Sequence, residues 1–180
     1  MLFLYKNLTF YVKYGIIYGT NPLGGMHYMI TLRLREATSN QPDYDLFDGM
    51  YKVFRYAEID DKTIPRTSGT LTTFEAYLEY ITNKGNILFI QEDGTDKVIG
   101  YFIMSWYEDG GARVNEMYIT EDNQRKGYGK KAVKALIALV KEEGFKWVEL
   151  MSYSIATDNF WSACNFRYTG SNDEYKFHIK

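Results

Sequence analysis

The sequence is poor in the residues that build disulfides and metal sites. Its one cysteine, Cys164, excludes an internal disulfide and suits a reducing cytoplasm, which is the location we expect. The two histidines, His27 and His178, lie far apart, and the chain has neither an H-x-x-x-H nor a C-x-x-C pair. Because metal ligands come in such clusters, the sequence predicts no metal centre.

The chain also lacks an excess of charge of one sign. Lysine and arginine number 21 against 23 aspartates and glutamates, so the formal net charge is −2. We therefore expect no general attraction to nucleic acid or to a membrane. Aromatic residues, in contrast, make up 17% of the chain, and 17 residues are tyrosines. The length of 180 residues suits one soluble domain with a sizeable core.

Long uncharged apolar runs are absent, even from the apolar segment 1–25. Lys6 and Lys13 interrupt that segment, so it predicts no membrane span, and no small-residue cleavage site follows it as in a secretory signal. We expect residues 1–28 to be a non-native extension from an upstream start codon, and residues 29–180 to form the domain. An additional strand or an amphipathic surface segment is the alternative.

The expected extension rests on what the codons of this segment can encode. Those for Leu23-Gly24-Gly25 can spell the purine-rich ribosome-binding sequence of bacteria, and Met26 and Met29 follow at once. Either methionine would then be the natural start. Mass spectrometry of the protein made from its native locus tests this, because a mass that includes Met1 excludes the later starts.

Apolar and polar residues alternate in several segments, which predicts strands, and helical spacing predicts helices elsewhere. The expected strands are 30–35, 86–91, 98–107, 112–119, 146–153, 166–169 and 174–179. The expected helices are 43–56, 74–83, 130–143 and 158–164. We expect a capping box of Thr72 and Glu75 to open the second helix, and Gly85 to end it.

The most informative stretch is Gln124–Gly129 (QRKGYG), between the strand 112–119 and the helix 130–143. Backbone N–H groups converge on an anion at a helix N-terminus, and the two glycines, which have no Cβ, let a phosphate approach the main chain. Neither a G-x-x-x-x-G-K-[ST] loop nor a G-x-G-x-x-G loop after a strand is present. An ordinary tight turn is the alternative. Three basic residues add positive charge beside the helix dipole: Arg125, Lys126 and Lys130.

This stretch resembles the Q/R-x-x-G-x-G/A signature of the GNAT acetyltransferase superfamily, with Gln124, Gly127 and Gly129 on its three fixed positions. An acid-bearing strand before it, an amphipathic helix after it and the F-W-x(4)-F ending at Phe160–Phe166 extend the resemblance over residues 29–179. It implies an α/β (α+β) fold, with a mixed, mostly antiparallel sheet of six to seven strands flanked by about four helices. The central parallel strands are expected to splay apart.

The resemblance further implies acetyl-CoA as co-substrate and a set of contacts to it. Main-chain atoms of Met117, Tyr118 and Ile119 would pair with the pantetheine arm, and the Ile119 N–H would polarise the thioester carbonyl. The diphosphate would rest on the amides of Gln124 to Gly129. The other side chains expected at the coenzyme are Arg125, Lys126, Tyr128, Lys130, Ser154, Phe160 and Trp161.

Two glutamates are candidate general bases that would take the proton of the attacking amine, Glu116 and Glu149. A salt-bridged surface glutamate is the alternative for each. Regular strand alternation would place Val114, Glu116 and Tyr118 on one face and Met117 on the other.

The expected general acid departs from the family pattern. Many members carry a tyrosine that returns a proton to the thiolate where this chain has Trp161, whose indole N–H donates a hydrogen bond but does not protonate sulfur. Asn165 replaces a glycine, and Ser154 stands where an asparagine often contacts the pantetheine. The substitute proton donors are Tyr118, Tyr128 and Tyr153. Cys164 is expected to be a small buried residue rather than a nucleophile.

The sequence thus predicts an acyl-CoA-dependent N-acetyltransferase that acts on the primary amine of a small cationic molecule, by direct attack in a ternary complex. The acidic loop with Glu58, Asp60 and Asp61 would either be simply solvated or attract that amine. A peptide amine and a different acyl donor are alternatives. An acyl-CoA-binding module without turnover is the alternative from another class, and Trp161 favours it. The acceptor and the oligomeric state stay open, although family members often form homodimers.

Overall fold

The computed structural model of the protein describes residues 32–60 and 71–179, with the side chains of 55–60 left out. The expected extension at 1–28 lies outside the described residues. Glu58 and Asp60 were predicted in an acidic loop, but their backbone lies in the last turn of a helix that ends at Asp60. Their side chains and Asp61 lie outside the described part of the chain. Within the described residues, no helix combines the length and the apolar character that crossing a membrane would require.

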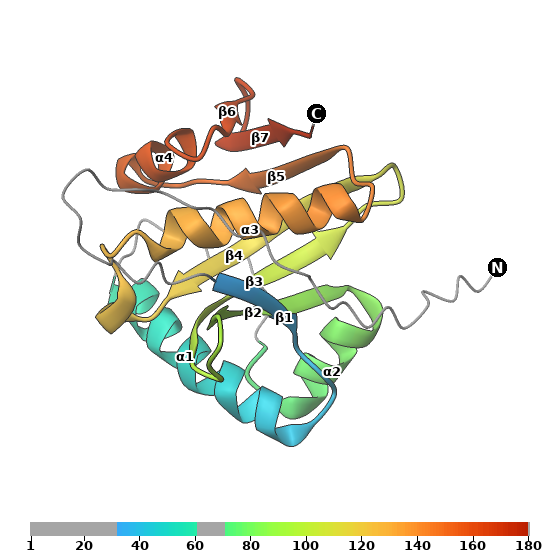
Figure 1. The fold of residues 1–180 in the computed structure, drawn as a ribbon, viewed down its shortest axis with the longest axis vertical. Helices are drawn as coiled ribbons and strands as arrows, with labels where there is room; N and C mark the ends of the chain where they lie inside the picture. Colours follow the sequence, from blue (N-terminus) through green and yellow to red (C-terminus); the bar gives the residue numbers. More distant parts are fainter. Residues whose placement is uncertain (1–31, 61–70, 180) are drawn as a thin grey trace.

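The described residues form a mixed sheet of seven strands in the order β1-β2-β3-β4-β5-β7-β6 (Figure 1). Neighbouring strands are antiparallel except β4 and β5, which are parallel. This confirms the predicted α/β architecture with a mixed, mostly antiparallel sheet. The strands are β1 Leu32–Glu36, β2 Gly85–Glu92, β3 Val98–Trp106, β4 Gly111–Ile119, β5 Trp147–Met151, β6 Arg167–Tyr168 and β7 Glu174–His178.

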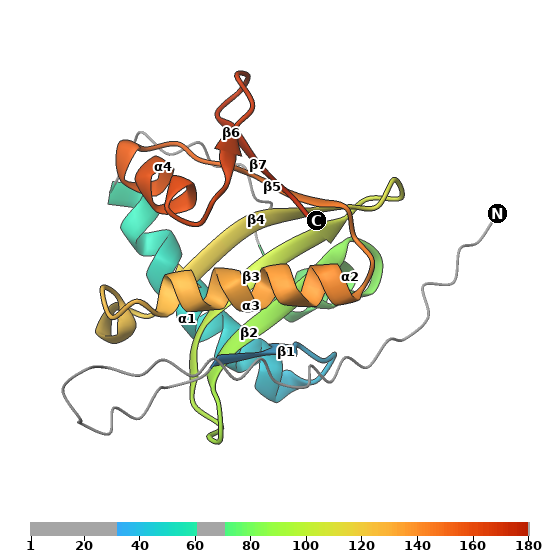
Figure 2. The ribbon, with the colours of Figure 1, turned by 45° about the horizontal axis from the view of Figure 1, so that its top comes forward.

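Helices cover both faces of this sheet, as Figures 1 and 2 show, with α3 on one face and α1 and α2 on the other. The described part of the chain holds a helix near each expected position. The helices are α1 Gln41–Asp60, α2 Phe74–Asn83, α3 Tyr128–Glu142 and α4 Ile155–Ser162, with a short 3-10 turn at Glu121–Asn123.

Two cores result, one on each face of the sheet. The α3-side core joins apolar residues of α3 to the strands, among them Phe102, Val114, Val133, Leu136 and Trp161. The α1/α2-side core is largely aromatic, with Phe47, Tyr51, Tyr77, Phe89 and Tyr101 among its members. Because the central strands are buried on both faces, their positions are determined by packing from two sides.

The start of α2 differs from the prediction. Thr73, rather than Thr72, is the N-cap, and its side chain accepts a hydrogen bond from the Ala76 N–H. The third helical residue is therefore Ala76 and not Glu75, so the expected capping box does not form. Gly85 does not end the helix either. It begins β2, where a Cβ would lie 1.9 Å from the carbonyl oxygen of Met104.

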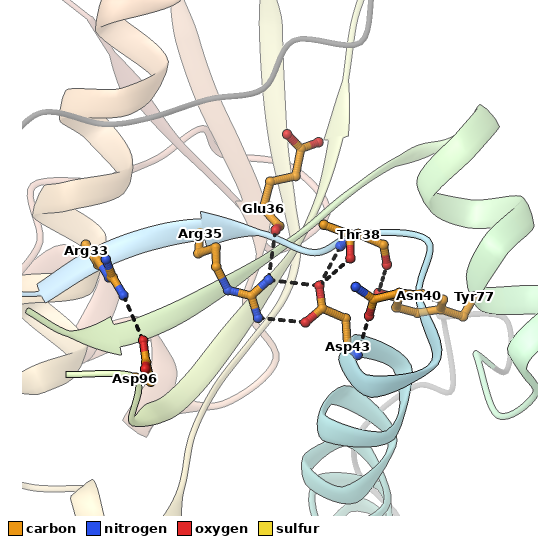
Figure 3. Close-up of polar contacts among 8 residues, drawn as sticks. All are labelled: Arg33, Arg35, Glu36, Thr38, Asn40, Asp43, Tyr77 and Asp96. Atoms are coloured by element: carbon orange, nitrogen blue, oxygen red, sulfur yellow. Dashed lines mark hydrogen bonds and ion pairs between the residues drawn. The ribbon is translucent and has the colours of Figure 1, made fainter.

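A network of hydrogen bonds around Asp43 holds the first turn of α1 against the end of β1 (Figure 3). The guanidinium of Arg35 donates to both carboxylate oxygens of Asp43, at 2.8 and 2.7 Å. Asp43 also accepts from the backbone N–H and the hydroxyl of Thr38, and the Tyr77 hydroxyl donates to the Thr38 carbonyl at 2.8 Å. Burial alone would raise the pKa of Asp43, but the hydrogen bonds from Arg35 and Thr38 outweigh it and lower that pKa. The network ties β1, α1 and α2 together.

Candidate functional site

β4 carries a β-bulge at Asn115, next to the centre of the sheet. Its pairing with β3 joins Glu116 to Ile103 and Val114 to Met104, so Asn115 is an extra residue on β4. A bulge bends its strand and increases the local twist. The direction of β4 therefore changes at Asn115.

The bulge also changes which side chains share a face, and here the prediction from regular alternation was wrong. Val114 and Met117 both pack into the α3-side core. Tyr118 belongs to the α1/α2-side core, and Glu116 accepts a hydrogen bond from Tyr101 of that same core. Because one inserted residue shifts the alternation by one, Glu116 and Tyr118 lie on the face opposite Val114.

β4 and β5 separate at the bulge. Their ladder holds four pairs, from Gly111–Trp147 to Val114–Leu150. β4 then continues to Ile119 beside β3, whereas β5 ends at Met151, and Figure 1 shows the two strands diverging toward the end where α3 begins. The predicted splayed pair is confirmed.

The main chain of Met117 and Ile119 faces the side that β5 has left. The N–H of Thr120 donates to the Ile99 carbonyl, near the start of β3, at 2.9 Å. In an antiparallel ladder alternate residues point the same way, so Tyr118 also bonds toward β3 while Met117 and Ile119 point away from it. The Ile119 carbonyl accepts a hydrogen bond from the Gln124 side chain at 2.8 Å. The N–H groups of Met117 and Ile119 are thus directed into the gap between the strands.

The predicted anion-binding turn connects this gap to the start of α3. Arg125 and Gly127 adopt the left-handed backbone conformation, with φ of 58° and 81°. Gly127 is the N-cap of α3, and no side chain caps the first turn. A Cβ at Gly127 would meet nothing within 4 Å, so the left-handed φ accounts for glycine here and crowding does not. First-turn amides at an uncapped helix N-terminus favour an anion. The basic side chains Arg125, Lys126 and Lys130 are exposed around it.

Gly129 has a different reason to be glycine. A Cβ there would lie 3.0 Å from the Phe160 ring of α4 and 3.8 Å from the Met117 methyl group. The close approach of the Phe160 ring therefore favours glycine at this position, since a Cβ would require the ring to shift. The predicted approach of a phosphate to Gly129 stays a prediction.

The two candidate bases have different surroundings. Glu116 is 8% exposed and is bonded by the Tyr101 hydroxyl. Glu149 accepts from the Tyr107 hydroxyl at 3.0 Å and forms ion pairs with Lys176 at 3.4 Å and Arg113 at 3.9 Å. Glu149 therefore matches the alternative of a salt-bridged glutamate. The roles of both as bases stay predictions.

Trp161 and Ser154 both have structural partners. Trp161 is 6% exposed and makes edge-to-face contacts with Phe160 and Phe166 at centroid distances of 5.0 and 5.2 Å. Ser154 is the N-cap of α4 and forms a capping box with Thr157. Their predicted contacts with the coenzyme are untested.

Asn165 and Cys164, which follow Trp161 in the sequence, have the properties that the sequence predicts for them. Asn165 has a left-handed φ of 68°, a conformation that asparagine tolerates better than most residues other than glycine. Burial raises the pKa of the half-buried Cys164 thiol, against a smaller opposing effect of Lys130, so the thiol is poorly nucleophilic.

The tyrosines proposed as substitute proton donors are spread around the site. Burial, and next the charge of Glu121, raises the pKa of Tyr118. The Tyr153 hydroxyl donates to the Met151 sulfur at 2.8 Å, and Tyr128 is buried at the start of α3. Two tyrosines near Glu116 went unrecognised in the sequence, Tyr80 and Tyr101, because nothing local signals which of 17 tyrosines reaches β4.

Of two hollows among the described residues, the larger lies at the paired start of β4 and β5, away from the gap, and the smaller lies beside the end of β4. The larger, of about 430 Å³, is lined by Tyr107, Glu108, Asp109, Trp147 and Glu149. The smaller, of about 220 Å³, is lined by Gly49, Met50, Val53, Tyr118, Thr120, Glu121 and Asp122. Among the described residues, no three histidine, cysteine, aspartate or glutamate side chains are grouped so that they could hold a metal ion.

Known structures share this fold. An acetyltransferase of the GNAT family from Staphylococcus aureus Mu50 is 17% identical, with a TM-score of 0.61 over 83% of this chain and 100% of its own. An acetyltransferase from Thermus thermophilus is 18% identical, with a TM-score of 0.60 over 84% and 100%. An aminoglycoside acetyltransferase from an uncultured soil metagenomic sample, solved in complex with sisomicin, is 16% identical, with a TM-score of 0.58 over 78% and 97%.

Sequence comparison leads to the same family. No match is found among curated proteins. The family model for the acetyltransferase (GNAT) family matches residues 51–166, which is more than half of the chain and includes the bulge, the gap and the turn. This family implies acyl-CoA-dependent acetyltransferase activity. The chain belongs to the GNAT family of acetyltransferases.

Proposed function

We propose that the protein transfers the acetyl group of acetyl-CoA to the primary amine of a small cationic molecule, by direct attack in a ternary complex. The observation that carries this proposal is the opening of β4 from β5 after Val114–Leu150, next to the uncapped N-terminus of α3. The opening leaves main-chain groups for an extended thioester arm, and the helix start supplies amides for its diphosphate.

The residues present fit the coenzyme. The first-turn amides of α3 and the turn from Gln124 would hold the diphosphate, with Arg125, Lys126 and Lys130 around it. The N–H groups of Met117 and Ile119 would bond to the pantetheine, and the Ile119 N–H is our candidate to polarise the thioester carbonyl. Phe160 would contact the arm where α4 approaches Met117.

The chemical step is a direct acyl transfer. The amine nitrogen attacks the carbonyl carbon, the carbon–sulfur bond breaks, and the thiolate leaves. We assign the removal of the amine proton to Glu116, directly or through water, because the bulge places it on the α1/α2 face of the gap. Water protonates the departing thiolate, since Trp161 lies in the α3-side core and its N–H is not acidic.

An assay of thiol release tests the proposal. Acetyl-CoA with a panel of polyamines, amino sugars and peptide amines should release free thiol with at least one acceptor. Gly127→Glu should abolish both acetyl-CoA binding and turnover, because it adds a negative side chain at the open position of the turn.

The matched control is Gly94→Glu in the β2–β3 hairpin. Gly94 also has a left-handed φ of 74° and open space at its Cβ, so it suffers the same backbone strain away from the gap. It should retain activity. Binding without thiol release from any amine would instead favour an acyl-CoA-binding module, and absence of binding would overturn the proposal.

A further inference from the structure

The bulge at Asn115 is held by a side chain from outside the two strands that form it. The Tyr80 hydroxyl of α2 donates to the Met104 carbonyl of β3 at 2.7 Å and accepts from the Asn115 side-chain amide at 3.0 Å. That amide also donates to the Ser105 hydroxyl at 2.7 Å. Met104 and Ser105 face Val114 and Arg113 in the β3–β4 ladder. One hydroxyl on α2 therefore joins both strands where the ladder is interrupted.

β2 begins with a glycine at the point where the Tyr80 hydroxyl reaches the Met104 carbonyl. A Cβ at Gly85 would lie 1.9 Å from the Met104 carbonyl oxygen and 2.8 Å from the Tyr80 hydroxyl. Only glycine leaves room for both atoms. Helix α2, β2, β3 and the bulge thus meet at the Tyr80 hydroxyl.

We infer that Tyr80 is a positioning residue for acetyl transfer, which acts by fixing the bulge and hence the direction of Met117 and Ile119 into the gap. The inference rests on the proposed function, since it concerns the groups assigned there to the thioester. The bulge interrupts the ladder with β3, and the ladder with β5 ends at Val114. Few backbone bonds therefore restrain β4 at this point, and the Tyr80 contacts supply the missing restraint.

The effect should be larger on catalysis than on coenzyme binding. The diphosphate contacts assigned to the turn at Gln124–Gly129 lie beyond the end of β4, whereas the carbonyl-polarising N–H lies within the stretch that the bulge directs. A displacement of about 1 Å at a reacting group can lower a rate about 100-fold. We expect Tyr80→Phe to lower kcat by about tenfold or more and to change KM for acetyl-CoA by less than about threefold.

Tyr77→Phe is the matched control. It is the same substitution on the same helix, and it also removes a hydroxyl that donates to a backbone carbonyl, that of Thr38 at 2.8 Å (Figure 3). Tyr77 is fully buried whereas Tyr80 is half-buried, so a loss due to destabilisation alone would be at least as large in Tyr77→Phe. Tyr77→Phe should leave kcat within about twofold of the original value. An equal fall of kcat in the two variants would overturn the inference.

A double-mutant cycle tests the route of the effect. Asn115→Ala, at an exposed side chain, should lower kcat about as much as Tyr80→Phe, and the double variant should be no slower than the slower single variant. If the fold reductions of kcat in the two single variants multiply in the double variant, the two residues act separately, which contradicts the inference.

Amide hydrogen exchange tests whether Tyr80 fixes the bulge, and it does not depend on turnover. The amides of Tyr118 and Thr120, which bond toward β3, should exchange faster in Tyr80→Phe and unchanged in Tyr77→Phe. If no amine is acetylated by the unmodified protein, the proposed function fails. The exchange comparison still supports or overturns the fixing of the bulge by Tyr80.

Discussion

Glu36, at the end of β1, should make the protein less stable as the pH rises. Its carboxylate is half-buried, and burial raises its pKa from 4.5 to about 7. Figure 3 shows that carboxylate turned away from the Arg35–Asp43 pair. Its partner is the Asn86 amide, whose own oxygen accepts from the Trp106 indole N–H at 2.7 Å. A neutral donor of this kind does not compensate a buried negative charge.

The sign and the size follow from proton linkage. Between about pH 4.5 and pH 7 the folded protein binds more protons at Glu36 than the unfolded chain, so the free energy of unfolding falls as the pH rises through this range. At about 1.4 kcal/mol per pKa unit, the shift corresponds to about 3 kcal/mol. Solvent screening at a partly exposed group reduces this to about 1–2 kcal/mol.

Urea denaturation of the original protein and of Glu36→Gln at pH 5 and pH 8 measures this directly. The stability of Glu36→Gln relative to the original protein should rise by about 1–2 kcal/mol between the two pH values, with unchanged m-values. Asp43→Asn is the control, since the pKa of Asp43 is lowered from 3.8 and this carboxyl stays ionised at both pH 5 and pH 8. The stability of Asp43→Asn relative to the original protein should therefore not change between the two pH values, because the contribution of Asp43 is lost only at lower pH. A relative stability of Glu36→Gln that does not change with pH would refute the reasoning.

Three further predictions concern the site and the helix that supports it. Gly129→Ala should lower activity, measured as thiol release, because the new Cβ lies 3.0 Å from the Phe160 ring. Adding Phe160→Leu to that variant should restore part of the activity, and no restoration would contradict the packing explanation. Glu116→Gln should lower kcat at least about tenfold and alter the acidic limb of the pH–rate profile, whereas Glu149→Gln should mainly lower the melting temperature; the reverse pattern would assign the base to Glu149. Thr73→Ala should destabilise the protein by about 1 kcal/mol in denaturation experiments, and Thr72→Ala should not.

Local patterns predicted the elements of the fold well, because each depends on residues close in sequence. The strand, turn and helix around Gln124–Gly129 formed where their periodicity and glycines placed them. Choosing Thr72 over Thr73 as N-cap was an error of one residue, since both side chains can cap and the packing of α2 decides between them.

The site depends on contacts between distant residues, and these were not predictable. Neither neighbour of Asn115 signals a bulge, which follows from hydrogen bonds to Tyr80 and Ser105 on other elements. Regular alternation therefore misplaced Val114 relative to Glu116. In the same way, the motif explained Gly129 by a phosphate, whereas its contact with Phe160 appears only when α4 is folded against α3.

The parting of β4 from β5 has a consequence for how tightly the two halves of the sheet are joined. Within the described strands, four rungs connect β1–β4 to β5–β7 along that seam, so a molecule lying in the gap would act as additional rungs. Binding of the coenzyme and the joining of the two halves of the sheet would then be thermodynamically linked, so that each would favour the other. At a concentration about 100 times its Kd, such a ligand would add about 2.7 kcal/mol to the unfolding free energy.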